Sequence, residues 1–547
     1  MTPTSSSSKH GEPLVAAPSD AAQDSSSRMD LALDVIEPAS APPPPEAVDE
    51  APAAVGMGTA AALGVISSGA SLVFSIVRSK VTAIALGPAG IGKVAEVMQI
   101  VTMANLPATM MTGPALVSGV AEAARRGDRV EVERIARTAT TVAVGASILG
   151  GIIAVVAGYW LLPPPWGRSA WPFTILAAAA ALFTAWAAIP QQILTAHARL
   201  TRLTVVRLLM TSSAVALLCA GTWLFGLTGQ FVALALSALI AVPIAGFALR
   251  RELGFFAMPS RAVDVAFVRR ALAIGATAFV AGCAGQGVLF TIRWTLEAHG
   301  GPQANGQFQA AYAIGATYFG IVLDGIGTYV LPRYAAAQTP AELAREMDAA
   351  AAFVFRMAPP AIFAAIAMRG LLVRALYSHR FDEANELVGL QMVADMARTI
   401  AWVQASPLLY RNRIRAYLIT EAAAVVLVAG GSVILVPIFG LNGVGYAYIL
   451  MYTSYAIITG IAVSKSCDVP FQGRRLAFTL LLTAAAYGVL RLTSLHESVR
   501  WVVLAGVLVA WKRNGVLDSV WRKVRSKLGV LTALNPFRRK QPASPPQ

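Results

Sequence analysis

Two basic residues, Arg78 and Lys80, lie inside an apolar stretch, 58–86, that is long enough to span a bilayer. A cation near the middle of a membrane span costs roughly 2.5–3.5 kcal/mol on insertion scales. We therefore expect both side chains to face a water-filled or ligand-filled interior rather than lipid. Cations in such a place would bind an anion, and the planar donor fork of arginine suits phosphate oxygens.

A second apolar stretch, 271–294, carries Arg293 near its end. The Gly-Pro turn at 87–90 also returns in altered form at 300–302, and the interval from Arg78 to Arg293 exceeds that from Pro88 to Pro302 by a single position. This spacing predicts two copies of one architecture, each directing a cation towards a shared cavity. The alternative is that the cations only extend to the membrane surface from helix ends. That alternative suits Arg293, near the predicted outer end of its helix, better than Arg78, which lies deeper.

Asp395 and Arg398 are three residues apart in the apolar run 387–410, which places them on one face of a helix. They form either a structural pair that neutralises itself or a switchable pair in the cavity wall. Glu96 and Asp324 are further carboxylates in or near predicted spans. Either could carry a coupling proton, because burial favours the neutral form of a carboxyl group.

The sequence shows no motif that indicates a metal site or a cofactor site. The five histidines and three cysteines are scattered, without zinc spacing or a nucleophile beside a base. The run GPAGIGKV at 87–94 resembles a phosphate-binding loop, but Val94 replaces the hydroxyl residue that would hold magnesium. We therefore expect no metal, no cofactor and no catalytic set, which indicates a transporter rather than an enzyme.

The composition indicates an all-α polytopic membrane protein. Of the 547 residues, 56% are hydrophobic and only 13% are charged, whereas a soluble protein has about 25% charged residues. The net charge of +15 comes from basic loops that alternate along the chain, so it needs no nucleic-acid partner. Because basic loops face the cytoplasm, both termini are predicted to be cytoplasmic.

Twelve long apolar runs and two shorter ones predict fourteen helices arranged as two six-helix lobes with a V-shaped central cavity, plus two extra C-terminal helices. The long runs are 58–86, 94–118, 138–162, 171–194, 203–225, 230–249, 271–294, 307–331, 351–372, 387–410, 416–438 and 443–464; the short ones are 476–490 and 501–511. The predicted domains are a disordered cytoplasmic tail at 1–55, an N-lobe at 56–250, a connector at 251–270, a C-lobe at 271–465, helices 13 and 14 at 466–512 and a basic cytoplasmic tail at 513–547.

Three stretches resemble one family: KVTAIALGPAGIG at 80–92, TYVLPRYAAAQTPAELAREM at 328–347 and GLLVRALYSHRFDEANELVGLQMVADMARTIAW at 370–402. The sequence is similar to the Wzx-type O-antigen and enterobacterial-common-antigen translocases of the multidrug/oligosaccharidyl-lipid/polysaccharide exporter superfamily. Lys80, Arg293, Asp395 and Arg398 fall where that family carries charged membrane residues, whereas Asp324 has no counterpart. The extra C-terminal helices look like those of the fourteen-helix lipid II flippases.

The resemblance implies a multi-pass flippase of the bacterial inner membrane. Its substrate would be an undecaprenyl-pyrophosphate-linked oligosaccharide, an O-antigen or exopolysaccharide repeat unit, moved from the cytoplasmic to the periplasmic leaflet by alternating access. The substrate-binding residues would be Arg78, Lys80, Arg293, Asp395 and Arg398, with Asp324 or Glu96 in coupling. The bilayer, a repeat-unit polymerase and a chain-length regulator would be its partners.

Two alternatives remain open at this point. A cation-coupled small-molecule exporter of the same superfamily predicts an acidic cavity, which the cations here do not favour. A membrane polysaccharide polymerase or ligase would need a large periplasmic loop or a catalytic carboxylate set, and the sequence shows no predicted outer loop of that length.

Overall fold

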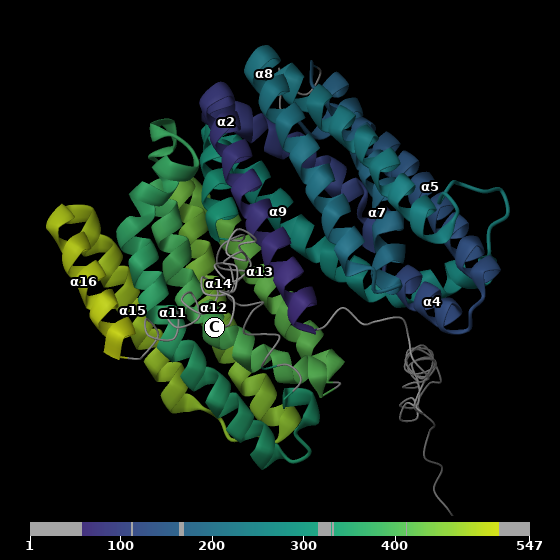
Figure 1. Cartoon of the computed structure of the whole chain (residues 1–547). Helices are drawn as coiled ribbons and strands as arrows, with labels where there is room; N and C mark the ends of the chain where they lie inside the picture. Colours follow the sequence, from purple (N-terminus) through teal and green to yellow (C-terminus); the bar gives the residue numbers. More distant parts are fainter. Residues whose placement is uncertain are drawn as a thin grey trace, which may run out of the picture. The chain divides into compact units, whose positions relative to one another are not determined.

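The computed structural model in Figure 1 describes residues 57–110, 113–162, 169–315, 330, 333–411 and 413–513. Within these ranges every long element is a helix and no strand occurs, which confirms the all-α prediction. The described residues from Gly58 onward form one compact unit. The predicted tail 1–55, almost all of the predicted tail 513–547, and Asp324 lie outside the described residues.

The chain up to residue 253 is here called the N-terminal half, and the chain from residue 265 the C-terminal half. The N-terminal half contains α2 (Met57–Ala104), α3 (Leu106–Met110), α4 (Gly113–Arg125), α5 (Arg129–Leu161), α7 (Trp171–Ala196) and α8 (Leu200–Leu253). The C-terminal half contains α9 (Val265–Ile314), α11 (Pro340–Leu376), η2 (His379–Phe381), α12 (Ala384–Tyr410), α13 (Ile414–Phe439), α14 (Leu441–Cys467), α15 (Gly473–Leu495) and α16 (Glu497–Arg513).

Eight of the described helices are long and apolar enough to cross a membrane, or nine if the bent helix α9 counts as one span. The chain is therefore a multi-pass membrane protein. The helix α12 is not among them because polar and charged side chains interrupt it, yet most of its residues are buried among other helices. The last helix, α16, is 17 residues long and packs against α11 and α15.

Several helices reverse direction at a glycine, so one continuous helix can hold two predicted spans. The 54 residues of α8 would extend about 80 Å if straight, far beyond a bilayer core of about 30 Å. At Gly226 φ is +58°, a conformation that favours glycine, and the chain folds back on itself. Beyond the turn, Gly229 packs so closely on Gly221 that an added Cβ would lie 1.9 Å from its carbonyl oxygen.

The turn geometry repeats at the spacing that the sequence predicts. Gly87 has φ 64° and ψ −175°, and Gly301 in the second half has φ 63° and ψ −168°. Gly226 has φ 58° and ψ −133°, and Gly440 has φ 58° and ψ −139°. Both pairs of glycines are separated by the same interval along the chain as Pro88 and Pro302. The two halves therefore share local architecture at both turns, while the lobe boundaries remain a prediction.

Side-chain caps begin the long helices that follow charged connectors. The Asp128 side chain accepts a hydrogen bond from the Glu131 backbone N–H at the start of α5. Thr339 and Glu342 form a capping box at the start of α11, each accepting from the other's backbone N–H. These caps satisfy N–H groups that the first helical turn leaves without partners.

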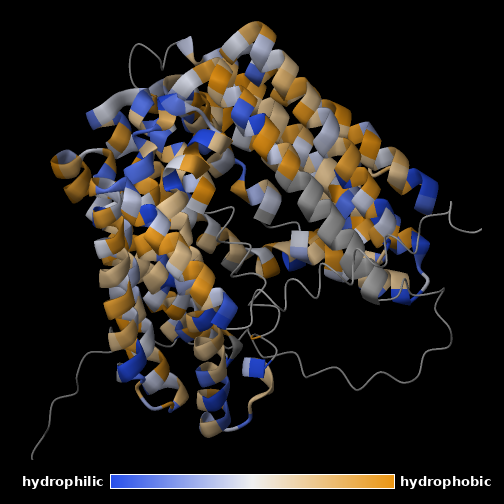
Figure 2. Cartoon of the chain, turned by 60° about the vertical axis from the view of Figure 1, so that its left-hand side comes forward, coloured by the Kyte–Doolittle hydropathy of each residue, from blue (hydrophilic) through white to orange (hydrophobic). Residues whose placement is uncertain are grey.

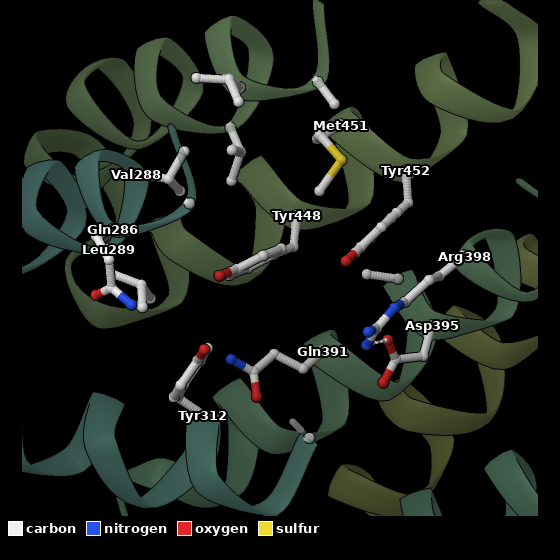
Figure 3. A pocket seen from close by; sticks show the side chains of 16 residues that line it. Gln286, Val288, Leu289, Tyr312, Gln391, Asp395, Arg398, Tyr448, Met451 and Tyr452 are labelled. Carbon is white, nitrogen blue, oxygen red and sulfur yellow. Dashed lines mark hydrogen bonds and ion pairs between the residues drawn. The ribbon is translucent and has the colours of Figure 1, made fainter. Parts of the chain in front are cut away.

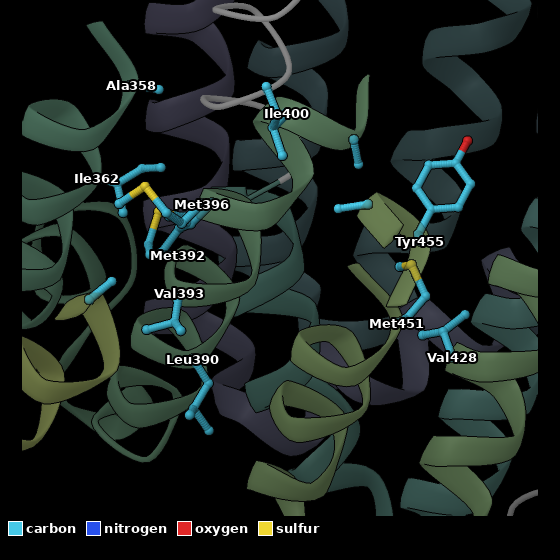
Figure 4. Close-up of a cluster of buried hydrophobic side chains, with 14 of the residues drawn as sticks. Ala358, Ile362, Leu390, Met392, Val393, Met396, Ile400, Val428, Met451 and Tyr455 are labelled. Atoms are coloured by element: carbon cyan, nitrogen blue, oxygen red, sulfur yellow. The ribbon is translucent and has the colours of Figure 1, made fainter. Parts of the chain in front are cut away.

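The apolar core of the C-terminal half lies around α12. Figure 4 shows Ile362 of α11 beside Met392 and Met396 of α12, and further away Val428 of α13 and Met451 of α14. All five side chains are at least nine-tenths buried. Because α12 is surrounded by apolar helices, its few polar side chains have a protein environment that lipid could not supply.

Hydrophobic residues occur along the lengths of the helices, as the colouring in Figure 2 shows, and many large apolar side chains are exposed. Trp160, Trp223 and Phe225 are each more than 60% exposed. All three lie close to predicted outer helix ends, where aromatic rings commonly occupy the membrane interface. This surface is suited to lipid rather than to water.

Candidate functional site

The two halves make a close contact at their equivalent Gly-Pro turns. A Cβ added to Gly92 would lie 1.9 Å from the Pro302 carbonyl oxygen, and one added to Gly306 would lie 1.8 Å from the Pro88 carbonyl oxygen. The interval that relates the two turns also maps the first contact onto the second. Glycine is therefore required at both positions for the backbones to approach this closely.

Just beyond this contact, one buried amide joins carboxylates from both halves. Asn305 Nδ2 donates to Glu96 Oε1 at 2.7 Å and to Glu297 Oε2 at 2.9 Å. Glu96 is 6% exposed and Asn305 is fully buried. Within the described residues, Glu96 Oε2 and Asn305 Oδ1 have no hydrogen-bond partner. The cluster thus places two carboxyl groups around a single donor, with spare acceptor oxygens.

Arg293 is the most deeply buried of the predicted binding cations, at 5% exposed. It donates to Gln309 Oε1, and its guanidinium carbon lies 5.2 Å from the centre of the Phe308 ring. These contacts span sixteen residues of α9, so the helix must fold back at Gly301 to make them. In the described part of the chain, its Nε and one terminal nitrogen are buried and have no hydrogen-bond partner.

Arg78 and Arg293 line one cavity of about 290 Å³, here called the N-half cavity. The other lining residues are neutral: Ser79, Thr82, Ile91, Val94, Ala95, Met98, Gln99, Thr102, Leu218, Gln230, Leu234, Gln309 and Tyr377. The described lining therefore carries two cations and no carboxylate. The sequence prediction expected Arg78 to be the deeper cation, but its side chain is exposed at this cavity while Arg293 is enclosed.

The structure does not place Lys80 in this cavity. Its ammonium group donates to the Arg374 carbonyl oxygen at 2.5 Å, beside the end of α11. In the same region the Arg374 guanidinium donates to both carboxylate oxygens of Asp382, at 3.0 and 2.9 Å, and these bonds lower the pKa of Asp382. Lys80 thus belongs to a peripheral charged cluster rather than to the group around Arg293.

Asp395 and Arg398 line a second cavity, of about 360 Å³, here called the C-half cavity (Figure 3). Arg398 donates to Asp395 Oδ1 at 3.3 Å, and its guanidinium carbon lies 5.7 Å from the centre of the Tyr452 ring. The remaining lining residues are Gly285, Gln286, Val288, Leu289, Tyr312, Gly315, Gln391, Ala394, Ala424, Val425, Val428, Tyr448, Met451 and Tyr452. Its described charged groups neutralise each other.

A hydrogen-bonded amide pair lies between the two cavities. Gln99, which lines the N-half cavity, donates from Nε2 to Gln286 Oε1 at 2.8 Å and to the Gln286 carbonyl oxygen at 3.0 Å. Gln286 in turn lines the C-half cavity. The two cavities therefore lie on either side of one polar contact between α2 and α9.

Sequence reasoning missed most of the neutral polar residues of the site. The amide residues Gln99, Asn305, Gln307, Gln309 and Gln391 all lie within or next to predicted spans, and their place in apolar runs was the available signal. Of these, Gln307 donates to the Arg380 carbonyl oxygen and accepts from the Ala384 backbone N–H. The signal was overlooked because uncharged side chains interrupt a hydropathy pattern only slightly.

No protein-family model matches the sequence. Among curated proteins, the lipid III flippases of Escherichia coli (strain K12) and Shigella flexneri are each 21% identical over 380 residues, covering 69% of this chain and 90% of theirs. An inward-facing multidrug-resistance MATE-family transporter of the MOP superfamily aligns with a TM-score of 0.59 and 13% identity, covering 78% of this chain and 99% of its own. The lipid II flippase MurJ, in an inward closed conformation, aligns with a TM-score of 0.58 and 11% identity, covering 85% and 98%. The chain therefore has the fold of these transporters, and the proteins named here are flippases and transporters rather than enzymes.

Proposed function

We propose that this protein is a flippase for a lipid-linked glycan, and that its substrate is an undecaprenyl-pyrophosphate-linked oligosaccharide such as an O-antigen or exopolysaccharide repeat unit. The lipid III flippase relatives and the MurJ-like fold support this class of substrate. The protein moves the substrate from the cytoplasmic to the periplasmic leaflet of the bacterial inner membrane. Both chain termini lie in the cytoplasm, as the distribution of basic loops indicates.

The observation that carries the proposal is the pair of cations in the N-half cavity. Arg78 and Arg293 line it with no carboxylate among the described lining residues. A buried, incompletely paired guanidinium is costly in a membrane protein and is usually functional. Its planar fork matches two phosphate oxygens, and such charge-assisted bonds are roughly twice as strong as neutral ones. A pyrophosphate is the group that best compensates these charges.

Transport follows from movement of the two predicted lobes, 56–250 and 271–465, around this cavity. The contacts of Gly92 with Pro302 and of Gly306 with Pro88 join the halves at the ends that the loop charges assign to the periplasm. We infer that these contacts close the periplasmic side and that the predicted V-shaped cavity then opens towards the cytoplasm. Separation of the two turns releases the substrate outward.

The carboxylate cluster supplies the coupling step. Glu96 belongs to the N-terminal half, whereas Asn305 and Glu297 belong to the C-terminal half. The protonation state of Glu96 therefore affects the hydrogen bond from Asn305 that joins the halves. Two carboxylates this close are stable together when a proton neutralises one of them. Protonation of Glu96 then favours contact between the two Gly-Pro turns, and loss of the proton favours their separation. Asp324 was the other coupling candidate and lies outside the described residues.

The remaining predicted residues and partners complete the scheme. Asp395 and Arg398 contact the glycan end of the substrate, and Lys80 acts at the outer end of the transport path. A repeat-unit polymerase and a chain-length regulator receive the product at the periplasmic surface.

The experiment is complementation of a flippase-deficient strain with Arg293→Ala, Arg78→Ala and Arg293→Lys, with protein abundance measured alongside surface polysaccharide. Both Ala variants should lose at least 90% of the polysaccharide, because each removes one charge-assisted anchor. Arg293→Lys should recover only part of it, because lysine keeps the charge and loses the fork. Arg374→Gln, which removes an exposed and paired cation, is the matched control. Full activity of both Ala variants at normal abundance would contradict the proposal.

A further inference from the structure

The C-half cavity differs from the cation-lined cavity in having no net charge among its described lining residues. Asp395 and Arg398 are its charged members, and they bind each other at 3.3 Å. A cationic ligand would have to compete with Arg398 for Asp395, and an anionic ligand would have to compete with Asp395 for Arg398. The cavity is therefore suited to a neutral, polar ligand.

The neutral polar groups in the cavity wall can both donate and accept hydrogen bonds. They are the amides of Gln286 and Gln391 and the hydroxyls of Tyr312, Tyr448 and Tyr452. Gln391 is 8% exposed, and its Oε1 has no partner among the described residues. A buried acceptor left unpaired is costly, so a ligand hydroxyl that donates to it would bind favourably. Sugar hydroxyls have this dual donor and acceptor character.

The tyrosine rings add flat apolar surfaces to these polar groups. Tyr448 and Tyr452 lie one helical turn apart on α14, with ring centres 6.2 Å apart and an angle of 18° between their planes. Figure 3 shows both rings at the cavity, with Tyr312 across from them. A wall of ring faces and amides suits a sugar ring, which has an apolar C–H face and a polar edge. The volume of about 360 Å³ lies within the usual range for small-ligand sites, about 300–1,000 Å³.

We propose that the C-half cavity binds neutral sugar residues of the lipid-linked glycan, next to the pyrophosphate held in the N-half cavity. This inference rests on the proposed flippase function. The Gln99–Gln286 contact lies between the two cavities, so the C-half cavity is adjacent to the site proposed for the pyrophosphate and is placed for the sugar that follows it. Gln391, Tyr312, Tyr448 and Tyr452 are then residues that recognise the glycan, while Arg78 and Arg293 recognise the anion.

The test uses the purified full-length protein in lipid nanodiscs and three probes: undecaprenyl pyrophosphate alone, and the same lipid carrying galactose or N-acetylglucosamine. The wild-type protein should bind at least one sugar-bearing probe about tenfold more tightly than the sugar-free probe, which corresponds to about 1.4 kcal/mol. Gln391→Leu and Tyr312→Phe should reduce this preference to about threefold or less without changing affinity for the sugar-free probe. Tyr159→Phe, at an exposed tyrosine of α5, is the matched control and should change neither affinity.

The outcomes separate this inference from the proposed function. The sugar site alone would be overturned if the wild-type protein bound all three probes with equal affinity. It would also be overturned if the Gln391 and Tyr312 variants lost affinity equally for all three probes. Absence of binding to every probe would overturn the pyrophosphate site and the proposed function with it. Arg293→Ala should lower the affinity for all three probes, because it removes a contact to the pyrophosphate that they share. If Gln391→Leu does not yield folded protein, Tyr452→Phe removes a single hydroxyl from the same wall and should also reduce the preference.

Discussion

The two cavities of this protein differ in whether their charged side chains are paired with opposite charges in the cavity wall. In the N-half cavity, Arg78 and Arg293 have no carboxylate among the described lining residues. In the C-half cavity, Arg398 is bound to Asp395 and packs over the Tyr452 ring. The lining of the first cavity thus offers two cations to an anionic ligand, although Arg293 also lines a smaller cavity with Glu96 and Glu297. The charges of the second cavity are already paired with each other. If the proposed function holds, one head group is recognised in two parts, an anion by charge and a glycan by neutral contacts.

The largest expected effect in the C-half cavity comes from splitting its ion pair. Arg398→Gln alone leaves Asp395, which is 4% exposed, without its partner, and removing one member of a buried pair costs about 3–5 kcal/mol. The double variant Asp395→Asn with Arg398→Gln removes both charges and should recover most of that loss. The measurement is the Tm of each purified variant in detergent.

This double variant also tests whether the pair is structural or switchable, the alternatives that the sequence left open. If the double variant is stable and still transports, the pair only neutralises itself. If it is stable but inactive, at least one of the two charges takes part in transport. A double variant no more stable than Arg398→Gln would contradict the description of this cavity as self-neutralised.

An intermediate effect is expected at the cluster that joins the halves. Glu96→Gln keeps an oxygen that can accept from Asn305 Nδ2 but removes the titratable group. The variant should remain folded, transport at about one tenth of the wild-type rate or less, and lose its response to a proton gradient. Flipping by reconstituted protein, measured with and without a pH difference across the liposome membrane, provides the test. A wild-type response to the gradient in Glu96→Gln would exclude Glu96 as the coupling group.

The smallest effect is expected at the exposed ion pair between Arg374 and Asp382. Because the Arg374 guanidinium lowers the folded-state pKa of Asp382, the pair stabilises the protein above the unfolded pKa of that carboxyl. The contribution disappears as the pH falls through the folded pKa. Asp382→Asn should therefore lower the Tm only slightly at neutral pH, since exposed pairs contribute little, and not at all in strong acid. A large loss of Tm at neutral pH would contradict the description of this pair as a weakly stabilising exposed contact.

The sequence predicted the parts of this architecture that depend on local signals. The repeat was visible at the Gly-Pro turns at 87–90 and 300–302. Each turn needs a residue with positive φ, and this conformation favours glycine, so the glycine appears in the sequence at both places. The cations Arg78 and Arg293 were conspicuous because charge is rare in apolar runs. These two signals were sufficient to predict that both arginines would line one cavity.

The sequence could not predict features that arise only when chain segments meet. Arg293 was expected near the outer end of its helix, but the returning half of α9 covers it with Phe308 and Gln309. Lys80 was grouped with Arg78 because they are two residues apart, although its ammonium group instead contacts a carbonyl at the end of α11. The tyrosine and amide wall of the C-half cavity combines residues from α9, α12 and α14, and nothing in any one segment indicated their convergence.

The central claim is that Arg78 and Arg293 together bind the pyrophosphate of the substrate. The most direct measurement is a cryo-electron microscopy structure of the full-length protein in nanodiscs with undecaprenyl pyrophosphate. Density for the two phosphates is expected within hydrogen-bond distance of both guanidinium groups, between α2 and α9. Phosphate density away from both arginines, with the N-half cavity filled only by solvent, would contradict it.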